Sequence, residues 1–297
     1  MQKWNALTGD TGANLKEARL QLHHAVQPLA AAGAALIPAR PDYTHTSLEY
    51  DAAAGAFVGA IYGDGGTSGR AVRGAFYFED FSLALITDGV DGADLDRATL
   101  IGKTFEESFA WFAAALKKAG FDQDLQGRAL ALSLPEYPDY PEHGLVTANA
   151  KFDADLKLVA EVQRYFSNTM PLLQSLVDQH KGASPITVWP HHFDMATLIT
   201  LKEPTEAGGE DGHSVGAGLS PGDMGNDAPY WYVTPWPYPD KDKLPALPAG
   251  RWNTDGWVGA QLDAREVLAV AGGAQAEVVG SYLQNAVQAS VDLISSK

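Results

Sequence analysis

Cysteine is absent from this sequence of 297 residues. The absence excludes disulfide bonds, thiolate nucleophiles, zinc ribbons and cysteine-ligated iron–sulfur clusters. A chain without thiols suits a reducing compartment, and we expect a cytoplasmic protein. The first residues, MQKWNALTGDTG, also lack an apolar segment behind a basic start, so the sequence predicts no signal peptide.

Positive charge and long apolar runs are both scarce. Lysine and arginine number 21 against 37 aspartates and glutamates, which gives a net charge of −16. An acidic surface repels phosphate backbones and anionic lipids, so neither a nucleic acid nor a membrane is an expected partner. No apolar run reaches the roughly 18 residues that a membrane-spanning helix needs. The chain therefore has the composition of an acidic, soluble, globular protein.

Helical and extended segments occur in groups along the chain. Helical periodicity covers residues 11–33, 104–119, 153–180 and 274–294. Thr104 and Glu107 form a capping box at the start of the second helix, and Pro28 is expected to kink the first helix or shorten its end. Extended patterns cover residues 74–87, 189–200, 213–220 and 229–236, and the glycine-rich stretch 63–70 reads as a hairpin loop. Strands in groups with helices at the ends predict an α+β fold with mainly antiparallel sheets.

The order of these segments suggests an internal duplication. A helix containing Pro28 leads into an extended segment, and a helix containing Pro171 leads into another. We interpret residues 1–150 and 151–297 as two half-repeats of a helix–strands–helix unit, which can pack together as one compact domain. The second half carries the candidate site.

The segment WPHHFDMATLIT places two histidines and an aspartate at the start of an expected strand. Residues two apart share a face of a strand, so His192 and Asp194 are predicted to point the same way, and His191 the other. An imidazole and a carboxylate on one face suit a metal ion or a base oriented by an acid. The histidines can equally serve to satisfy backbone groups at the strand start.

The segment HSVGAGLSPGD offers further candidates. His213 opens it, and we group His213 with His192 and Asp194 as predicted ligands of a divalent metal. Small residues such as Gly218 let a ring or a ligand approach a strand closely. Asp223 follows a turn centred on Pro221–Gly222 and is a candidate ligand-binding residue. The alternative is a plain hairpin connection in which Asp223 caps local N–H groups.

Aromatic residues surround these blocks. Tyr230, Tyr232, Trp236 and Trp189 are predicted to line a pocket for a small polar ligand, with stiff proline-rich loops as its walls. The alternative for these side chains is ordinary core packing. A second histidine pair, His23–His24, lies in the first expected helix without an acidic partner in register, and we assign it to the surface or to a cap.

The blocks WPHHFDMATLI, GLSPGD, PYWYVTPWPYP and GWVGAQL follow one another between about residues 184 and 262. In this order they resemble a family of uncharacterised bacterial proteins. The resemblance implies that the blocks form one functional unit, but it supplies no reaction.

Two classes of function follow from these residues. In the first, His192, Asp194 and His191 are catalytic, with or without a divalent metal, in a hydrolase or lyase of a small polar metabolite. In the second, the same pocket binds a carbohydrate or another metabolite without catalysis. The sequence alone does not choose between them.

Overall fold

The computed structural model describes residues 4–7, 9, 12–63, 71–89, 92–137, 139–206, 209 and 211–295. The chain divides into two compact units that are discontinuous in sequence. Unit 1 comprises residues 1–16, 164–187 and 194–297, and unit 2 comprises residues 17–163 and 188–193. The predicted division near residue 150 lies inside unit 2, and the internal duplication stays a prediction.

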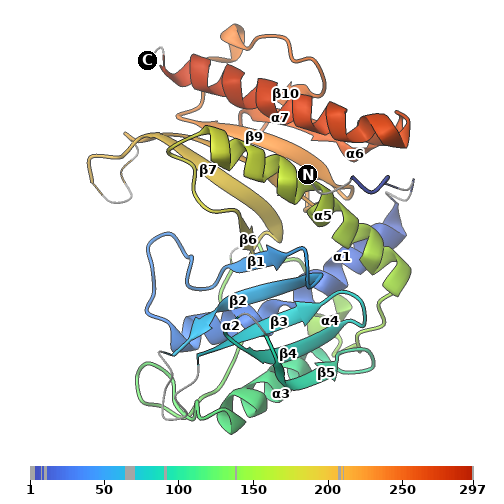
Figure 1. The fold of residues 1–297 in the computed structure, drawn as a ribbon, viewed down its shortest axis with the longest axis vertical. Coiled ribbons are helices and arrows are strands. Elements are labelled where there is room, and N and C mark those ends of the chain that lie inside the picture. The colour runs from blue at the N-terminus through green and yellow to red at the C-terminus, as the bar shows by residue number, and fades with distance from the viewer. Residues whose placement is uncertain are drawn as a thin grey trace. The chain divides into compact units, whose positions relative to one another are not determined.

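Unit 2 is built on an antiparallel sheet with the strand order β6-β1-β2-β3-β4-β5 (Figure 1). The strands are β1 (Leu48–Asp51), β2 (Ala56–Tyr62), β3 (Val72–Tyr77), β4 (Ser82–Thr87), β5 (Asp94–Thr99) and β6 (Thr187–Trp189, in unit 2 from Val188). The helices are α1 (Ala13–Ala25, in unit 2 from Glu17), α2 (Gln27–Leu36), α3 (Phe105–Lys118) and α4 (Gly144–Thr147).

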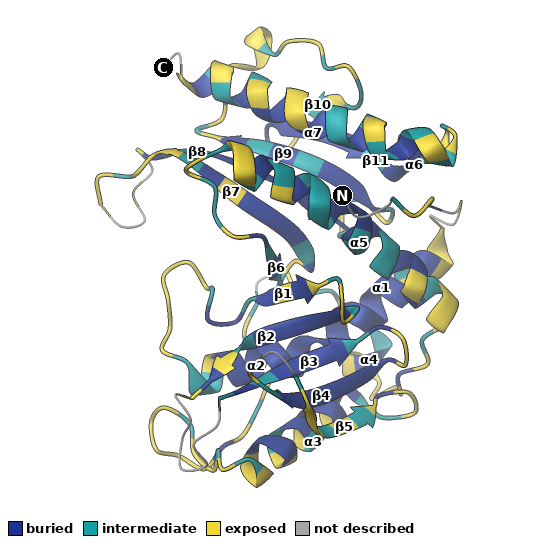
Figure 2. Ribbon diagram, viewed as in Figure 1, coloured by how far each residue is buried: buried dark blue, intermediate teal, exposed yellow. Residues whose placement is uncertain are grey.

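Helices α2 and α3 pack closely on this sheet because a glycine leaves room for them. A Cβ atom on Gly74 of β3 would lie 2.4 Å from Leu29 Cδ2 of α2 and 2.6 Å from Phe112 Cζ of α3. Leu29 and Phe112 are themselves buried. The core of unit 2 therefore lies between these helices and the sheet, where Figure 2 shows β3 and β4 as mostly buried.

Unit 1 carries the antiparallel strand order β10-β11-β9-β8-β7. The strands are β7 (Asp194–Lys202), β8 (His213–Ser220), β9 (Tyr230–Trp236), β10 (Arg251–Asn253) and β11 (Gly259–Asp263). The helices are α6 (Ala264–Leu268), α7 (Gly272–Ser295) and, from residue 164 on, α5 (Leu156–Gln179), with a short 3₁₀ turn η1 at Lys241–Lys243. Trp231 of β9 is fully buried and donates a hydrogen bond from Nε1 to Thr169 Oγ1 of α5 at 2.8 Å.

The predicted α+β class with mainly antiparallel sheet is confirmed. The capping box is also confirmed, since Glu107 N–H donates to the Thr104 hydroxyl and Thr104 N–H donates to the Glu107 carboxylate. Val26 separates α1 from α2, with Pro28 in the first turn of α2. The single strand predicted over 74–87 is wrong: β3 and β4 pair as a hairpin, and Phe81 just before β4 has φ +52°.

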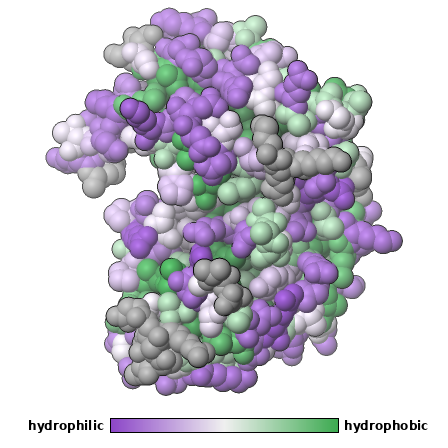
Figure 3. All heavy atoms as spheres, in the orientation of Figure 1, coloured by the Kyte–Doolittle hydropathy of each residue, from purple (hydrophilic) through white to green (hydrophobic). Residues whose placement is uncertain are grey.

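The glycine-rich loop predicted at 63–70 lies outside the described residues from 64 on, although β2 and β3 on either side of it pair antiparallel. Hydrophilic side chains cover much of the face drawn in Figure 3, as the excess of acidic residues leads one to expect. None of the helices within the described ranges combines the length and the apolar character needed to cross a membrane.

Candidate functional site

The histidines of the HHFD segment lie in a turn, where the sequence predicted a strand. Strand β7 begins only at Asp194, and residues 190–193 form the turn before it. Phe193 has φ +59°, a left-handed conformation that bulky residues rarely adopt. The predicted alternation between His192 and Asp194 is therefore wrong, because residues in a turn do not follow the period of a strand.

The buried side chain of Phe193 fixes this turn within unit 2. Its ring stacks on the His23 imidazole with the centroids 5.2 Å apart and an interplanar angle of 10°. It also meets Phe57 of β2 edge-on at 5.7 Å. Burial of a large aromatic ring contributes roughly 2–3 kcal/mol, which offsets the cost of the left-handed backbone.

His23 and His24 are core residues, so their predicted place at the surface is wrong. The two side chains are 3% and 0% exposed. The Nε2–H group of His23 donates to the Pro190 carbonyl at 2.8 Å, and the Gln27 amide donates to the same oxygen at 2.8 Å. The His23–Pro190 contact joins α1 to the turn at residues 190–193, and the two residues are 167 positions apart in the sequence. No local pattern in the sequence predicts a contact between residues so far apart.

One ring nitrogen of His24 forms a hydrogen bond, and the other has no partner among the described residues. Its Nδ1–H donates to the Leu20 carbonyl at 2.7 Å. A neutral imidazole carries one N–H, so Nε2 is left with a lone pair. That buried Nε2 has no hydrogen-bond partner among the described residues. The Pro141 carbonyl faces the ring and favours its protonated form, but it does not offset the effect of burial.

Two tyrosines of the loop 137–143 close over these histidines. The Tyr140 ring lies edge-on to His23 at 5.2 Å and to His24 at 5.0 Å, and it lies 5.8 Å from Tyr137. Tyr137 in turn lies 5.9 Å from His191, whose ring is 4.4 Å from His192. The buried hydroxyl oxygens of both tyrosines lack hydrogen-bond partners in the part of the chain that the structure describes.

We call this set the histidine–tyrosine cluster, and all of it belongs to unit 2. Its members are His23, His24, Tyr137, Tyr140, His143, His191 and His192. His24 marks its buried end, and His192, which is exposed, marks its outer end. The sequence predicted two of these seven residues, His191 and His192. The sequence YPDYPEH of the loop also contained a signal for this cluster, because Tyr137, Tyr140 and His143 recur at intervals of three residues.

His143 has a structural role in the cluster. Its Nδ1 accepts from the Leu145 N–H at 3.2 Å and so caps α4, while Nε2–H donates to the Glu17 carboxylate at 3.1 Å. Burial raises the pKa of Glu17, but hydrogen bonds from Gln21 and His143 outweigh it, and the pKa lies below its usual value. Both nitrogens of His143 are therefore occupied.

Burial keeps the inner members of the cluster neutral. It lowers the pKa of His23 to about 3 and the pKa of His24 to about 4, with smaller contributions from neighbouring charges. Burial and then the nearby His192 lower the pKa of His191 to about 4. Burial also raises the pKa of both Tyr137 and Tyr140. At neutral pH these three imidazoles and two phenols are therefore neutral.

Four of the predicted residues meet in unit 1 instead. The Tyr232 hydroxyl donates to Asp194 Oδ2, and the Tyr230 hydroxyl donates to Asp223 Oδ2 at 2.5 Å. The two tyrosine rings lie 6.2 Å apart, as residues two apart on β9 should. Burial raises the pKa of both tyrosines, and the adjoining carboxylates add to this effect.

A glycine makes the contact between Tyr232 and Asp194 possible. Gly218 of β8 pairs with Tyr232 on one side and Ala196 on the other. A Cβ atom on Gly218 would lie 2.8 Å from Tyr232 Cζ. The ring of Tyr232 therefore reaches across β8 at the point where the strand has no side chain. Small residues of β8 were predicted to allow such an approach.

Asp223 acts as a turn cap. Its Oδ1 accepts from the backbone N–H groups of Gly225 and Asn226, both at 2.7 Å, while Oδ2 accepts from Tyr230. These contacts agree with the alternative interpretation from the sequence, in which Asp223 caps local N–H groups.

The predicted metal set does not assemble. In the β7–β8 pair, Met195 lies opposite Leu219 and Lys202 lies opposite His213. Asp194 and His213 are therefore at opposite ends of the pair, about 25 Å apart at the rise of a strand, and cannot share an ion. Among the described residues there is no group of three or more histidines, aspartates or glutamates placed to hold a metal.

The remaining predicted residues lie apart. Trp189 is half-buried in unit 2, with its ring 6.0 Å from His191. Trp236 ends β9 in unit 1, where its exposed ring meets Tyr238 at 5.4 Å. Comparison with models of protein families, with curated proteins and with solved structures gave no match to this chain. The resemblance to the bacterial family stays a prediction.

Proposed function

We propose that the protein binds a small polar ligand at the histidine–tyrosine cluster. In this proposal His24 Nε2 accepts a hydrogen bond from the ligand, and the hydroxyls of Tyr137 and Tyr140 donate to it. The observation that carries the proposal is the set of three buried polar atoms without partners in one connected group of rings. Buried polar groups are rarely left unpaired, and each one costs roughly 1–3 kcal/mol.

The pKa values favour binding over proton transfer. A general acid or base works best when its pKa lies near the working pH. The pKa values of His23, His24 and His191 lie at about 3, 4 and 4, and those of Tyr137 and Tyr140 are raised. Such groups keep one protonation state at neutral pH. They act as fixed acceptors and donors, so a non-catalytic binding protein for a carbohydrate or another metabolite is the function that we favour.

A second candidate is an enzyme, and one observation favours it. His191 and His192 lie 4.4 Å apart on a turn whose Phe193 has a left-handed backbone, and strained backbone is often found at functional sites. In this alternative, exposed His192 is the catalytic group, with His191 in support, in a hydrolase or lyase.

Thermal unfolding in the presence of sugars, polyols and small hydroxy acids tests the favoured proposal. We expect at least one of these compounds to raise the unfolding temperature of the wild type, as ligands of the folded state do. The increase should be lost in Tyr137→Phe and Tyr140→Phe, which delete only a hydroxyl group. Tyr238→Phe, at an exposed tyrosine, is the matched control. An equal increase in Tyr140→Phe, or none with any compound in the wild type, would contradict the proposal.

A further inference from the structure

Residues 4–7 form neither a helix nor a strand, but side chains of α5 and α7 hold them within unit 1 (Figure 1). On α5, Asn168 accepts a hydrogen bond from the Asn5 N–H group at 2.9 Å and donates one to the Asn5 carbonyl at 2.7 Å. A single side-chain amide thus pairs with both backbone groups of one residue, as a neighbouring strand does in a sheet. Asn168 is buried, and both polar atoms of its side chain bond to this segment.

On α7, the buried side chain of Gln275 binds the two ends of the same segment. Its Oε1 atom accepts from Trp4 Nε1–H at 3.1 Å and from the Leu7 backbone N–H at 2.9 Å. The Leu7 side chain is buried and Trp4 is half-buried, whereas the two residues between them are exposed. The segment is therefore anchored by a side chain at each end and by its backbone in the middle.

The middle of the segment passes very close to the start of α7. A Cβ atom on Gly272, the first residue of α7, would lie 2.8 Å from Ala6 Cβ. On the other side, Arg164 Nη1 of α5 donates to the Ala6 carbonyl at 3.4 Å. We call the four residues that receive the segment, Arg164, Asn168, Gly272 and Gln275, the segment site. Hydrogen bonds to the main chain, combined with spaced side-chain anchors, are a usual way in which proteins recognise an extended peptide.

The chain thus contains both a peptide-recognition site and a sequence, WNAL, that fits it. Residues 8–12 connect this sequence to α1. If two copies exchange residues 4–7 reciprocally, each site keeps all the contacts described above, and the cost is the loss of freedom on association. We propose that the segment site receives residues 4–7 of a second copy of this chain, which gives a dimer with twofold symmetry. This dimer is independent of the ligand proposed for the histidine–tyrosine cluster, which belongs to unit 2.

Docking within one chain competes with docking between two chains, because a segment attached to its own molecule has a high effective concentration. A test must remove this competition. Leu7→Asp removes it from one side, since a carboxylate in place of the buried Leu7 side chain disfavours docking and leaves the site free. Gly272→Ala removes it from the other side, because the new Cβ would overlap Ala6 and leave the segment free.

A mixture of these two full-length variants provides the test. Leu7→Asp offers a free site, and Gly272→Ala offers a free segment. We expect sedimentation velocity to show a heterodimer in the mixture, whereas each variant alone stays monomeric at the same concentration. A labelled peptide with the sequence of residues 1–9, MQKWNALTG, should bind Leu7→Asp. Adding Gly272→Ala to that variant should weaken peptide binding by about fivefold or more, the effect of overpacking a close contact.

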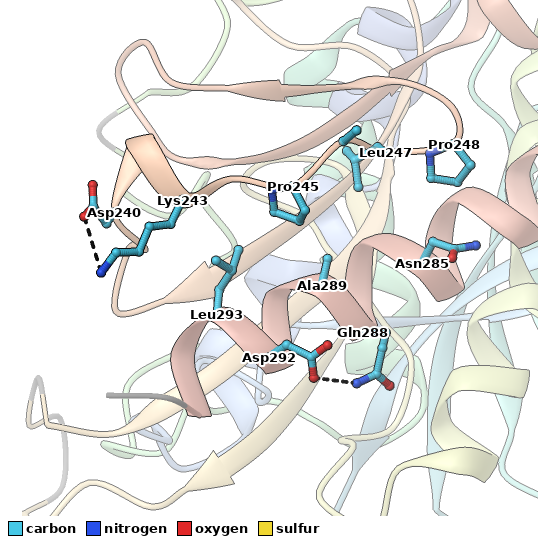
Figure 4. A pocket seen from close by; sticks show the side chains of 11 residues that line it. Asp240, Lys243, Pro245, Leu247, Pro248, Asn285, Gln288, Ala289, Asp292 and Leu293 are labelled. Carbon is cyan, nitrogen blue, oxygen red and sulfur yellow. Dashed lines mark hydrogen bonds and ion pairs between the residues drawn. The ribbon is translucent and has the colours of Figure 1, made fainter.

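Two further variants are matched controls. Asn5→Ala changes an exposed side chain of the segment, whose contacts with Asn168 involve the backbone, so it should not replace Leu7→Asp in the mixture. Ala289→Phe changes α7 about 25 Å further along the helix than Gly272. Ala289 lines a separate hollow of about 580 Å³ between α7 and the loop 240–248 (Figure 4), so its variant should not replace Gly272→Ala.

Three results would overturn the proposal. If the mixture contains no heterodimer although Leu7→Asp binds the peptide, the site accepts the sequence but two copies do not exchange it. If Leu7→Asp forms no heterodimer and binds no peptide, the segment docks only within its own chain. Equal heterodimer formation with either control variant would mean association through another surface. Circular dichroism checks that each variant is folded, and Trp4→Ala, at the half-buried anchor, replaces Leu7→Asp if that variant does not fold.

Discussion

Tyr232 of β9 donates a hydrogen bond to Asp194 of β7 across the strand that separates them. The intervening strand β8 has Gly218 at the crossing point, in register with Tyr232. The phenol and the carboxylate are distant in sequence, and the absence of one side chain brings them together. This relationship makes Gly218 part of the geometry of Asp194.

Gly218→Ala is expected to destabilise the protein by about 1–3 kcal/mol, the usual cost of overpacking. The new Cβ would lie 2.6 Å from the Met195 carbonyl oxygen and 2.8 Å from the Ala196 Cβ and the Tyr232 Cζ. Gly216→Ala on the same strand is the control, since its Cβ would meet nothing closer than Thr234 O at 3.9 Å. Urea unfolding of both variants measures the difference in their free energies of unfolding. Equal stability of the two variants would show that the space at Gly218, where Tyr232 passes over β8, is not tightly packed.

Tyr232→Phe is expected to cost about 1–3 kcal/mol, because it removes a donor from the half-buried carboxylate of Asp194. Tyr230→Phe should cost less, about 0.5–1.5 kcal/mol, because Asp223 keeps two backbone N–H donors. Denaturant unfolding of the two variants gives the comparison. A larger loss of stability in Tyr230→Phe than in Tyr232→Phe would show that the Tyr230–Asp223 hydrogen bond contributes more than the Tyr232–Asp194 hydrogen bond, which would contradict this prediction.

The parts of the fold that depend on neighbouring residues could be predicted from the sequence. The capping box of Thr104 and Glu107 acts over three residues, and the effect of Pro28 on the end of the first helix is a local steric one. The site could not be predicted in the same way. His23 is buried because Pro190 and Phe193 cover it, and neither contact leaves a pattern in the sequence around His23. The left-handed backbone of Phe193 likewise ended the expected strand, because tertiary packing outweighs local preference there.

Tyr140→Phe is expected to leave the ligand-free protein as stable as the wild type, or more stable by about 1–2 kcal/mol. The substitution removes a buried hydroxyl that has no partner among the described residues and keeps the ring contacts with His23 and His24. Tyr62→Phe is the control at a buried tyrosine whose hydroxyl donates to the Leu29 carbonyl at 3.2 Å. Thermal and urea unfolding check the pair. If Tyr140→Phe loses as much stability as Tyr62→Phe, the hydroxyl of Tyr140 has a partner within the protein.

The buried histidines predict how stability depends on pH. Burial lowers the folded-state pKa of His23 to about 3 and that of His24 to about 4, against 6.5 for an unperturbed histidine. Below about pH 6.5 the unfolded chain therefore takes up protons that the folded chain does not, and the stability present above that pH is lost as the pH falls towards about 4 and 3. Each histidine contributes a slope of up to about 1.4 kcal/mol per pH unit in this window.

Replacement of one histidine measures how much that histidine contributes to the pH dependence of the free energy of unfolding. His24→Gln does not titrate and can still donate to the Leu20 carbonyl. We expect its free energy of unfolding to fall less steeply than that of the wild type between about pH 6 and 4, by up to about 1.4 kcal/mol per pH unit. Contributions from the carboxylates cancel in the difference between variant and wild type. At pH 8 both forms of residue 24 are neutral, so the difference there reports packing alone. Parallel pH profiles for the two proteins would mean that His24 titrates equally in the folded and unfolded chains, and that it is not held neutral by burial.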